Sequence, residues 1–98
     1  MLKKVLFSTL VAIIVMFFAL TGFGHASTLG SRVLRYGSRG ADVSELQRLL
    51  NNFGFNAGDI DGIYGIKTQD AVIRFQQSKN LIVDGIAGPQ TIRVLLGN

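Results

Sequence analysis

The stretch Asp61-Gly62-Ile63-Tyr64-Gly65-Ile66-Lys67-Thr68 decides the fold, because the chain repeats it. It returns as Asp84-Gly85-Ile86-Ala87-Gly88-Pro89-Gln90-Thr91, 23 positions further along. Each Asp-Gly pair favours a tight turn, since aspartate can hydrogen-bond its downstream backbone and glycine accepts a positive φ. An apolar pattern at helical spacing follows each copy. The repeat therefore predicts two similar turn-helix units that pack on each other.

Another helical pattern precedes the repeats and starts at Ala41. The second helix is expected to begin near Ile66 or Lys67 and to run to about Ser78. The third is expected to begin at Pro89, whose fixed φ suits the first helical position. The sequence thus predicts an all-α fold: a compact three-helix bundle with two repeated glycine-rich turn-helix units and, at most, vestigial strands.

The expected core follows from the spacing of apolar residues. The three helices should bury Val43, Leu46, Leu49, Leu50, Phe53, Ala71, Val72, Phe75, Ile92, Leu95 and Leu96. Between the repeats, the stretch 81–83 (Leu-Ile-Val) should return to the core. Gly54 and Asn80 are expected to end their helices in a left-handed conformation.

The N-terminus has the pattern of a secretory signal peptide. Lys3 and Lys4 precede an almost wholly apolar run from Val5 to Leu20. The small residues of Gly24-His25-Ala26 then favour cleavage before Ser27. This predicts a signal peptide at 1–26, a flexible lead at 27–32 and one domain at 33–98, located outside the cytoplasm. In the alternative, the segment stays uncleaved as an anchor, which is the only membrane contact expected.

Composition excludes several function classes. The chain has 10 Lys plus Arg and 6 Asp plus Glu, and removing Lys3 and Lys4 leaves 8 against 6, about +2. This charge is too small to predict nucleic-acid binding. With no cysteine, the domain must be stabilised by core packing and has no thiol chemistry.

Neither catalysis nor metal binding is predicted. The only histidine, His25, lies in the signal segment, so no serine has a base to activate it. The Asp59-x-Asp61-Gly62 stretch fails the spacing of a calcium loop, and no zinc ligand set is present. Asp59 and Asp61 are too close along a turn to face each other across a sugar substrate. We therefore expect a non-enzyme without cofactor.

The two loops are the candidate binding elements. The second glycine of each motif, Gly65 or Gly88, is expected to permit close backbone approach at the helix entry. Backbone amides and short polar side chains along one rim would suit neutral or carboxylate-bearing ligands such as glycans and peptide stems. The structural alternative is that these residues only build the turns.

The chain resembles the peptidoglycan-binding type 1 domain. The stretch Leu34-Arg35-Tyr36-Gly37-Ser38-Arg39-Gly40-Ala41-Asp42-Val43, followed by Leu46-Gln47-x-x-Leu50, is similar to its opening. The pattern continues in order through Gly54-Phe55, Asp61 to Gly65, Thr68, Ala71-Val72, Phe75-Gln76, Leu81, Asp84-Gly85 and Thr91. Asn80 departs from the glycine usual there but tolerates the same backbone. The resemblance implies a three-helix module that binds bacterial cell wall, similar to the N-terminal part of spore cortex-lytic enzymes.

The leading hypothesis is a secreted, non-catalytic module that binds peptidoglycan through its glycan strand or its stem peptide. The expected ligand-binding residues are Arg39, Gln47, Asp61, Tyr64, Lys67, Thr68, Gln76, Asp84 and Thr91. Tyr64 is the candidate to stack on a sugar face, with packing at the edge of the core as its alternative. Two other hypotheses remain open: a protein-interaction or inhibitory module acting on a partner cell wall hydrolase, and a truncated remnant of a longer cortex-lytic enzyme.

Overall fold

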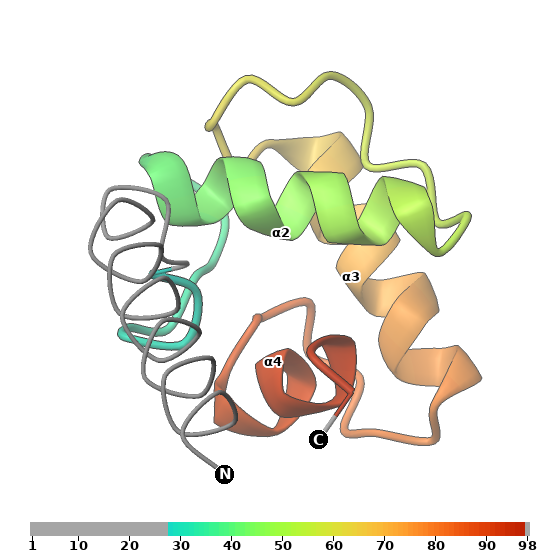
Figure 1. The fold of residues 1–98 in the computed structure, drawn as a ribbon. Coiled ribbons are helices and arrows are strands. Elements are labelled where there is room, and N and C mark those ends of the chain that lie inside the picture. Colours follow the sequence, from blue (N-terminus) through green and yellow to red (C-terminus); the bar gives the residue numbers. More distant parts are fainter. Residues whose placement is uncertain (1–27, 98) are drawn as a thin grey trace, which may run out of the picture.

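The computed structural model describes residues 28–97, which fold around three helices: α2 (Ala41–Asn52), α3 (Ile66–Ser78) and α4 (Pro89–Leu95). They form the three sides of a triangle around a shared core (Figure 1). The predicted all-α fold is confirmed, and α3 and α4 begin where the repeat predicted. The predicted signal peptide lies outside the described residues. Within residues 28–97, none of the helices has the length and apolar character needed to cross a bilayer.

The core collects one apolar face from each helix. On α2 and α3, the buried positions recur every three or four residues, as an amphipathic helix requires. Phe55, in the loop after α2, packs edge-on against Phe75, with ring centroids 5.4 Å apart. The buried apolar residues are Leu29, Leu34, Val43, Leu46, Leu50, Ala57, Tyr64, Ala71, Val72, Phe75, Ala87, Ile92 and Leu95.

Four residues predicted to be buried are exposed. Phe53 and Leu96 follow the last residues of α2 and α4, so the chain leaves the helical spiral before their side chains can face inward. Ile82 and Val83 also lie at the surface, and only Leu81 of that stretch packs against the core. Asn80 does adopt the predicted left-handed conformation, with φ 57°.

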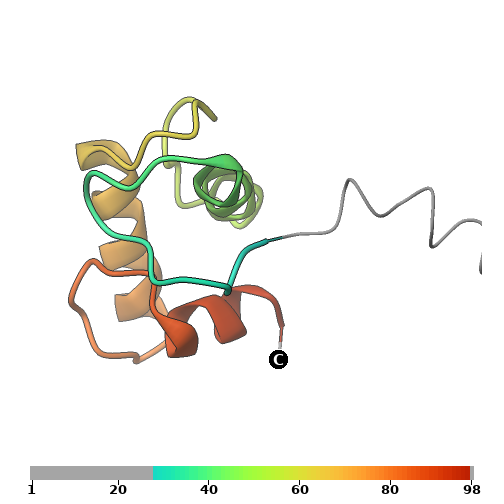
Figure 2. The same ribbon diagram turned by 90° about the vertical axis from the view of Figure 1, so that its left-hand side faces the viewer.

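The segment before α2 is bound to the domain, contrary to the flexible lead predicted for it. Leu29 is buried in the core. The guanidinium of Arg32 pairs with the carboxylate of Asp42 through Nε–Oδ2 and Nη2–Oδ1 distances of 2.8 and 3.0 Å, and Nη2 also donates to the carbonyl of Arg39. This guanidinium holds the pKa of Asp42 below its usual value. The segment thus runs from α4 to the start of α2 along one side of the domain (Figure 2).

This segment also contacts both repeat loops through the backbone. Leu34 exchanges two hydrogen bonds with Ala87, at 3.1 and 2.8 Å, as an isolated antiparallel bridge. Ser38 accepts a hydrogen bond from the Tyr64 amide, and Gly37 donates one to the Tyr64 carbonyl, both at 2.9 Å. Tyr64 and Ala87 occupy equivalent positions of the repeat. The vestigial strands expected from the sequence are therefore short backbone pairings, through which the segment before α2 joins the two loops.

Candidate functional site

A buried glutamine holds the first loop from within. Gln47 of α2 donates through Nε2 to Asp61 Oδ1, the carbonyl of Ile63 and Oγ1 of Thr68, at 3.0, 2.9 and 3.0 Å. Its Oε1 accepts hydrogen bonds from the amides of Asp61 and Gly62. Asp61 Oδ1 in turn accepts from the Ile63 amide, which closes the turn. One side chain thereby fixes the loop from its first residue to the start of α3.

The second loop is held by the same six hydrogen bonds. Gln76 of α3 donates to Asp84 Oδ1, the carbonyl of Ile86 and Oγ1 of Thr91, at 2.8, 3.0 and 3.0 Å. It accepts from the amides of Asp84 and Gly85, and Asp84 accepts from the Ile86 amide. Within residues 28–97, no buried side-chain polar atom lacks a partner. We call this arrangement, seen at Gln47 and again at Gln76, the glutamine clamp.

The clamps leave two ionised carboxylates at the surface. The amide of Gln47, followed by the backbone amide of Ile63, lowers the pKa of Asp61. For Asp84, the Ile86 amide is the larger cause and Gln76 the second. Because these donors stabilise the charged form, each loop presents an exposed carboxylate near neutral pH.

Close backbone approach occurs at the first glycine of each motif, not at the second as predicted. Gly62 and Gly85 have φ of 73° and 72°, and their missing side chains face neighbouring atoms. A Cβ on Gly65 or Gly88 would meet no such atom within 4 Å, since both residues are extended N-caps. The motif therefore needs its first glycine for conformation and space.

We expect Gly62→Ala to destabilise the domain more than Gly85→Ala. Both introduce a Cβ at positive φ, which costs about 1 kcal/mol. At Gly62 the new Cβ would lie 3.1 Å from the backbone oxygen of Gly40 and 2.9 Å from Ser44 Oγ, whereas at Gly85 it meets only side-chain carbons of α3. Chemical denaturation should show a loss of about 2–4 kcal/mol for Gly62→Ala and about 1–2 kcal/mol for Gly85→Ala. Equal losses would contradict the stated role of the backbone contact.

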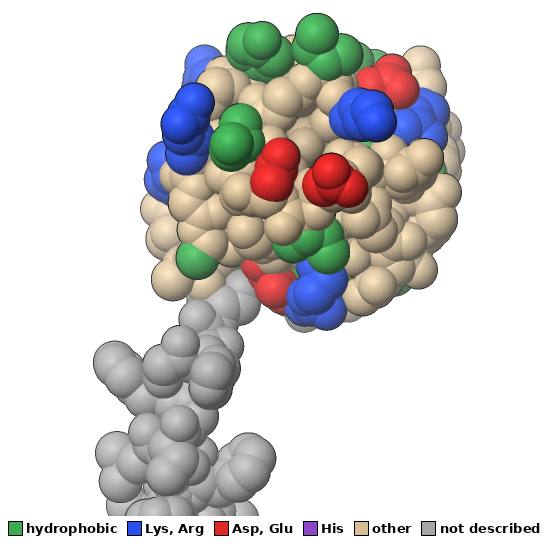
Figure 3. Space-filling view, turned by 90° about the horizontal axis from the view of Figure 1, so that it is seen from above, with side chains coloured by type: hydrophobic (Ala, Val, Ile, Leu, Met, Phe, Trp, Pro, Cys, Tyr) green, Lys and Arg blue, Asp and Glu red, His purple; other side chains and the backbone are tan. Residues whose placement is uncertain are grey.

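Each loop borders a surface pocket. The first pocket, of about 360 Å³, is lined by Tyr36, Gln47, Ala57, Asp59, Asp61, Ile63, Gly65, Ile66, Lys67 and Thr68. The second, of about 150 Å³, is lined by Ile82, Asp84, Ile86, Gly88, Pro89, Gln90 and Thr91. The face formed by α2 and the loop before α3 carries acidic side chains between exposed apolar groups, with basic side chains toward its sides (Figure 3).

A comparison with known families identifies the chain. The peptidoglycan binding domain family matches residues 39–95, which include α2, both clamped loops and α4. This chain belongs to the peptidoglycan binding domain family. The resemblance found in the sequence is thereby confirmed.

Relatives of this peptidoglycan binding domain include an amidase and spore cortex-lytic enzymes. The N-acetylmuramoyl-L-alanine amidase CwlM of Mycobacterium tuberculosis is 41% identical over 71 residues, covering 68% of this chain and 18% of the amidase. The spore cortex-lytic enzyme of Bacillus subtilis is 37% identical over 93 residues, covering 91% of this chain and 30% of the enzyme. This chain therefore spans less than a third of the length of either relative.

The fold agrees with a solved relative. The crystal structure of the SleB N-terminal domain superposes with a TM-score of 0.69 at 38% identity, covering 71% of this chain and 96% of that domain. The peptidoglycan binding domain described here is thus related to the N-terminal module of a cell wall hydrolase. The match to nearly the whole of a separately crystallised domain indicates that residues of this extent fold as a unit.

The structure places five of the nine predicted binding residues inside the peptidoglycan binding domain. Tyr64 is 1% exposed and donates its hydroxyl to the Gly85 carbonyl at 2.7 Å, so it packs in the core and cannot stack on a sugar in this conformation. Its burial raises the pKa of its hydroxyl. The clamp residues are likewise almost fully buried, and their side chains are hydrogen-bonded within the domain: Gln47, Thr68, Gln76 and Thr91.

The other four predicted residues are exposed, but they do not all line the same pocket. Asp61 and Lys67 line the first pocket, and Asp84 lines the second. Arg39 is exposed and pairs through its backbone with Ile63, although its side chain lines neither pocket.

One exposed aromatic residue of the first pocket, Tyr36, was not among the predicted binding residues. Tyr36 is 58% exposed and lines the first pocket, beside the exposed side chain of Ile66. It lies in the segment that pairs with the repeat loop, 28 residues before Tyr64 in the chain. The available signal was its place between Arg35 and Gly37, which is typical of a turn at the surface.

Proposed function

We propose that this domain binds peptidoglycan without modifying it and that the first pocket is its principal contact. The observation that carries the proposal is the composition of that pocket. An exposed aromatic ring, Tyr36, stands beside ionised Asp61 and the ammonium group of Lys67. The ring offers a rigid apolar contact surface to the ligand, and the charged groups can pair with the ammonium and carboxylate groups of a stem peptide.

A third pocket, of about 460 Å³, is a weaker candidate. It lies between helix ends and the loop after α2, and is lined by Phe53, Phe55, Phe75, Ser78, Lys79, Val94 and Gly97. It has one charged side chain and no part of either clamped loop.

A binding role without catalysis is supported by the residues that surround the pockets. Among residues 28–97, no group of three His, Cys, Asp or Glu side chains could hold a metal ion. Asp59 and Asp61 are two positions apart on one loop and both line the first pocket. We further propose that segment 1–26 directs export and that the domain acts in the extracytoplasmic wall, as an independent binder or as the targeting part of a hydrolase.

Co-sedimentation of residues 27–98 with insoluble peptidoglycan tests the proposal. Chitin and cellulose serve as polysaccharide controls, and circular dichroism confirms that the protein is folded. We expect selective pelleting with peptidoglycan. A folded protein that stays in the supernatant would overturn the proposal and favour a protein partner.

The site within the domain is tested by two matched aromatic substitutions. Tyr36→Ala should weaken binding to peptidoglycan about tenfold, as expected for a central aromatic contact worth about 1.4 kcal/mol. Phe53→Ala is the control, because Phe53 is 54% exposed but lies in the other pocket. Both variants should unfold at nearly the wild-type temperature. Unchanged binding by Tyr36→Ala would remove the first pocket from the contact surface.

A further inference from the structure

The two loop pockets are built from equivalent positions of the repeat. Every residue that lines the second pocket stands 23 positions after a residue that lines the first. Four of the seven pairs keep the motif residue: Asp61 with Asp84, Ile63 with Ile86, Gly65 with Gly88, and Thr68 with Thr91. The glutamine clamp supports both. The domain thus carries two copies of one surface feature.

The copies differ in charge. Asp59 of the first pocket corresponds to Ile82 of the second, and Lys67 corresponds to Gln90. Among residues 28–97, the ion pairs are Arg32–Asp42, Glu45–Arg48 and Asp70–Arg74. Asp59 and Lys67 therefore enter none of them and are available to charged groups of a ligand. The second pocket retains the motif carboxylate but has an apolar residue and a neutral amide at the other two positions.

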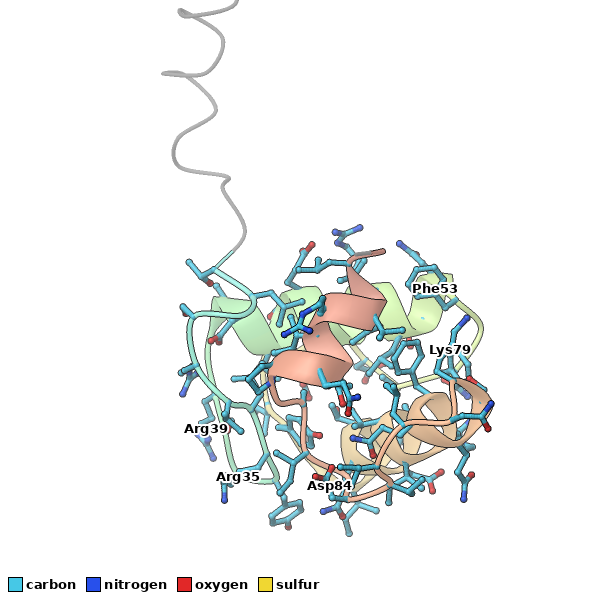
Figure 4. The ribbon with its side chains drawn as sticks, turned by 90° about the horizontal axis from the view of Figure 1, so that it is seen from below. Arg35, Arg39, Phe53, Lys79 and Asp84 are labelled. Carbon is cyan, nitrogen blue, oxygen red and sulfur yellow. The ribbon has the colours of Figure 1, made fainter. Side chains whose placement is uncertain are left out.

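The backbone holds the two loops that border the pockets close together. Leu34 pairs with Ala87 of the second loop, and Ser38 pairs with Tyr64 of the first. Four residues of chain span at most about 14 Å, which limits the separation of these two pairings. Arg35, between the pairings, and Asp84 lie at the same edge of the domain (Figure 4). The loops that border the two pockets are therefore within reach of one polymer molecule.

We propose that the domain has two repeat-related subsites that bind chemically different parts of one wall polymer, an inference that rests on the proposed function. The charged first pocket binds the stem peptide, whose ammonium and carboxylate groups complement Asp59, Asp61 and Lys67. The second pocket binds an uncharged sugar, whose apolar face packs on Ile82 and whose hydroxyl and amide groups hydrogen-bond to Asp84 and Gln90. Occupying both on one strand raises affinity through effective concentration.

Amide chemical shifts of isotopically labelled residues 27–98 test this assignment. The two probes are stem peptides released from peptidoglycan by an amidase, and the peptide-free glycan fragments left from the same wall. We expect the stem peptides to shift amides of residues 59–68 and the glycan fragments to shift those of 82–91. Both probes acting on one loop, or neither probe reaching the second loop, would overturn the proposal.

Charge substitutions give a second, independent readout. Lys67→Gln introduces the residue found at the equivalent position of the second loop, and should weaken stem-peptide binding about tenfold while leaving glycan binding unchanged. Lys79→Gln is the matched control, because Lys79 lies at the other end of α3. The double substitution I82D/Q90K gives the second pocket the charges of the first, and should add shifts near residues 82–91 with the stem peptide. Glycan binding that falls equally in Lys67→Gln would contradict separate subsites.

Binding to intact wall distinguishes failure of the two-subsite assignment from failure of the proposed function. If wild-type protein pellets with peptidoglycan but only one loop responds to fragments, the proposed function stands and the two-subsite assignment fails. If the folded protein does not pellet at all, both fail.

Discussion

Replacing Gln76 with alanine is expected to lower the free energy of unfolding by about 3–5 kcal/mol, one of the two largest effects foreseen in this domain. The substitution removes five hydrogen bonds of the second clamp. It leaves the Gly85 amide and the Thr91 hydroxyl buried without their partner, and each such loss costs about 1–3 kcal/mol. A domain of this size is stable by roughly 4–10 kcal/mol, so the variant should be close to unfolding at 37 °C.

The neighbouring glutamine provides the control. Gln77 is exposed on the same helix, so Gln77→Ala should change stability by less than about 0.5 kcal/mol. Urea denaturation followed by circular dichroism measures both variants. A loss below about 1 kcal/mol for Gln76→Ala would show that water replaces the clamp and that the loop is not held by it.

The repeated motif and the proline at the start of α4 made most of the fold predictable. Pro89 marks the start of α4, because its fixed φ suits the first helical position, and the repeat places the start of α3 at the equivalent residue, Ile66. Apolar spacing then identified the buried faces of the helices. It failed at Phe53 and Leu96, where the pattern continues past the residue at which the helix ends.

The clamp could not be found from the repeat. Asp61 and Asp84 are 23 positions apart, whereas Gln47 and Gln76 are 29 apart, since the connection from α2 to the first loop is longer. When the two repeats are aligned, Gln76 therefore corresponds to Phe53, and the alignment does not pair Gln76 with Gln47. Both were predicted to contact a ligand. A glutamine amide both donates and accepts hydrogen bonds, so beneath a loop it can satisfy backbone amides and carbonyls at the same time.

The burial of Tyr64 was not predictable for a similar reason. A tyrosine between glycines in a loop has the local pattern of an exposed tip, and nothing local shows what lies below it. In the folded domain, the loop of Tyr64 is covered by the segment around Gly37 and Ser38, which hydrogen-bonds to its backbone on both sides. That contact turns Tyr64 inward and leaves Tyr36 exposed at the rim of the pocket.

The second large effect is expected for Tyr64→Ala, which should cost about 3–5 kcal/mol, as removal of a buried aromatic ring does. Tyr64→Phe should cost only about 1 kcal/mol, because it keeps the ring and loses the hydrogen bond to Gly85. Thermal unfolding measures both variants, and Tm should fall by about 4–8 °C for each kcal/mol of lost stability.

Binding of Tyr64→Phe to peptidoglycan separates a core role from a contact role. Since the hydroxyl donates to a carbonyl inside the domain, the folded variant should pellet with the wall as well as wild type does, whereas Tyr36→Ala should not. If Tyr64→Phe instead lost binding at unchanged stability, the hydroxyl would have to reach the ligand. That would require the covering segment 34–38 to separate from the first loop when the wall binds, breaking both of its hydrogen bonds to Tyr64. Two backbone bonds and a buried ring oppose such an opening, so we expect Tyr64 to act on binding only through the stability of the loop that carries Asp61 and Lys67.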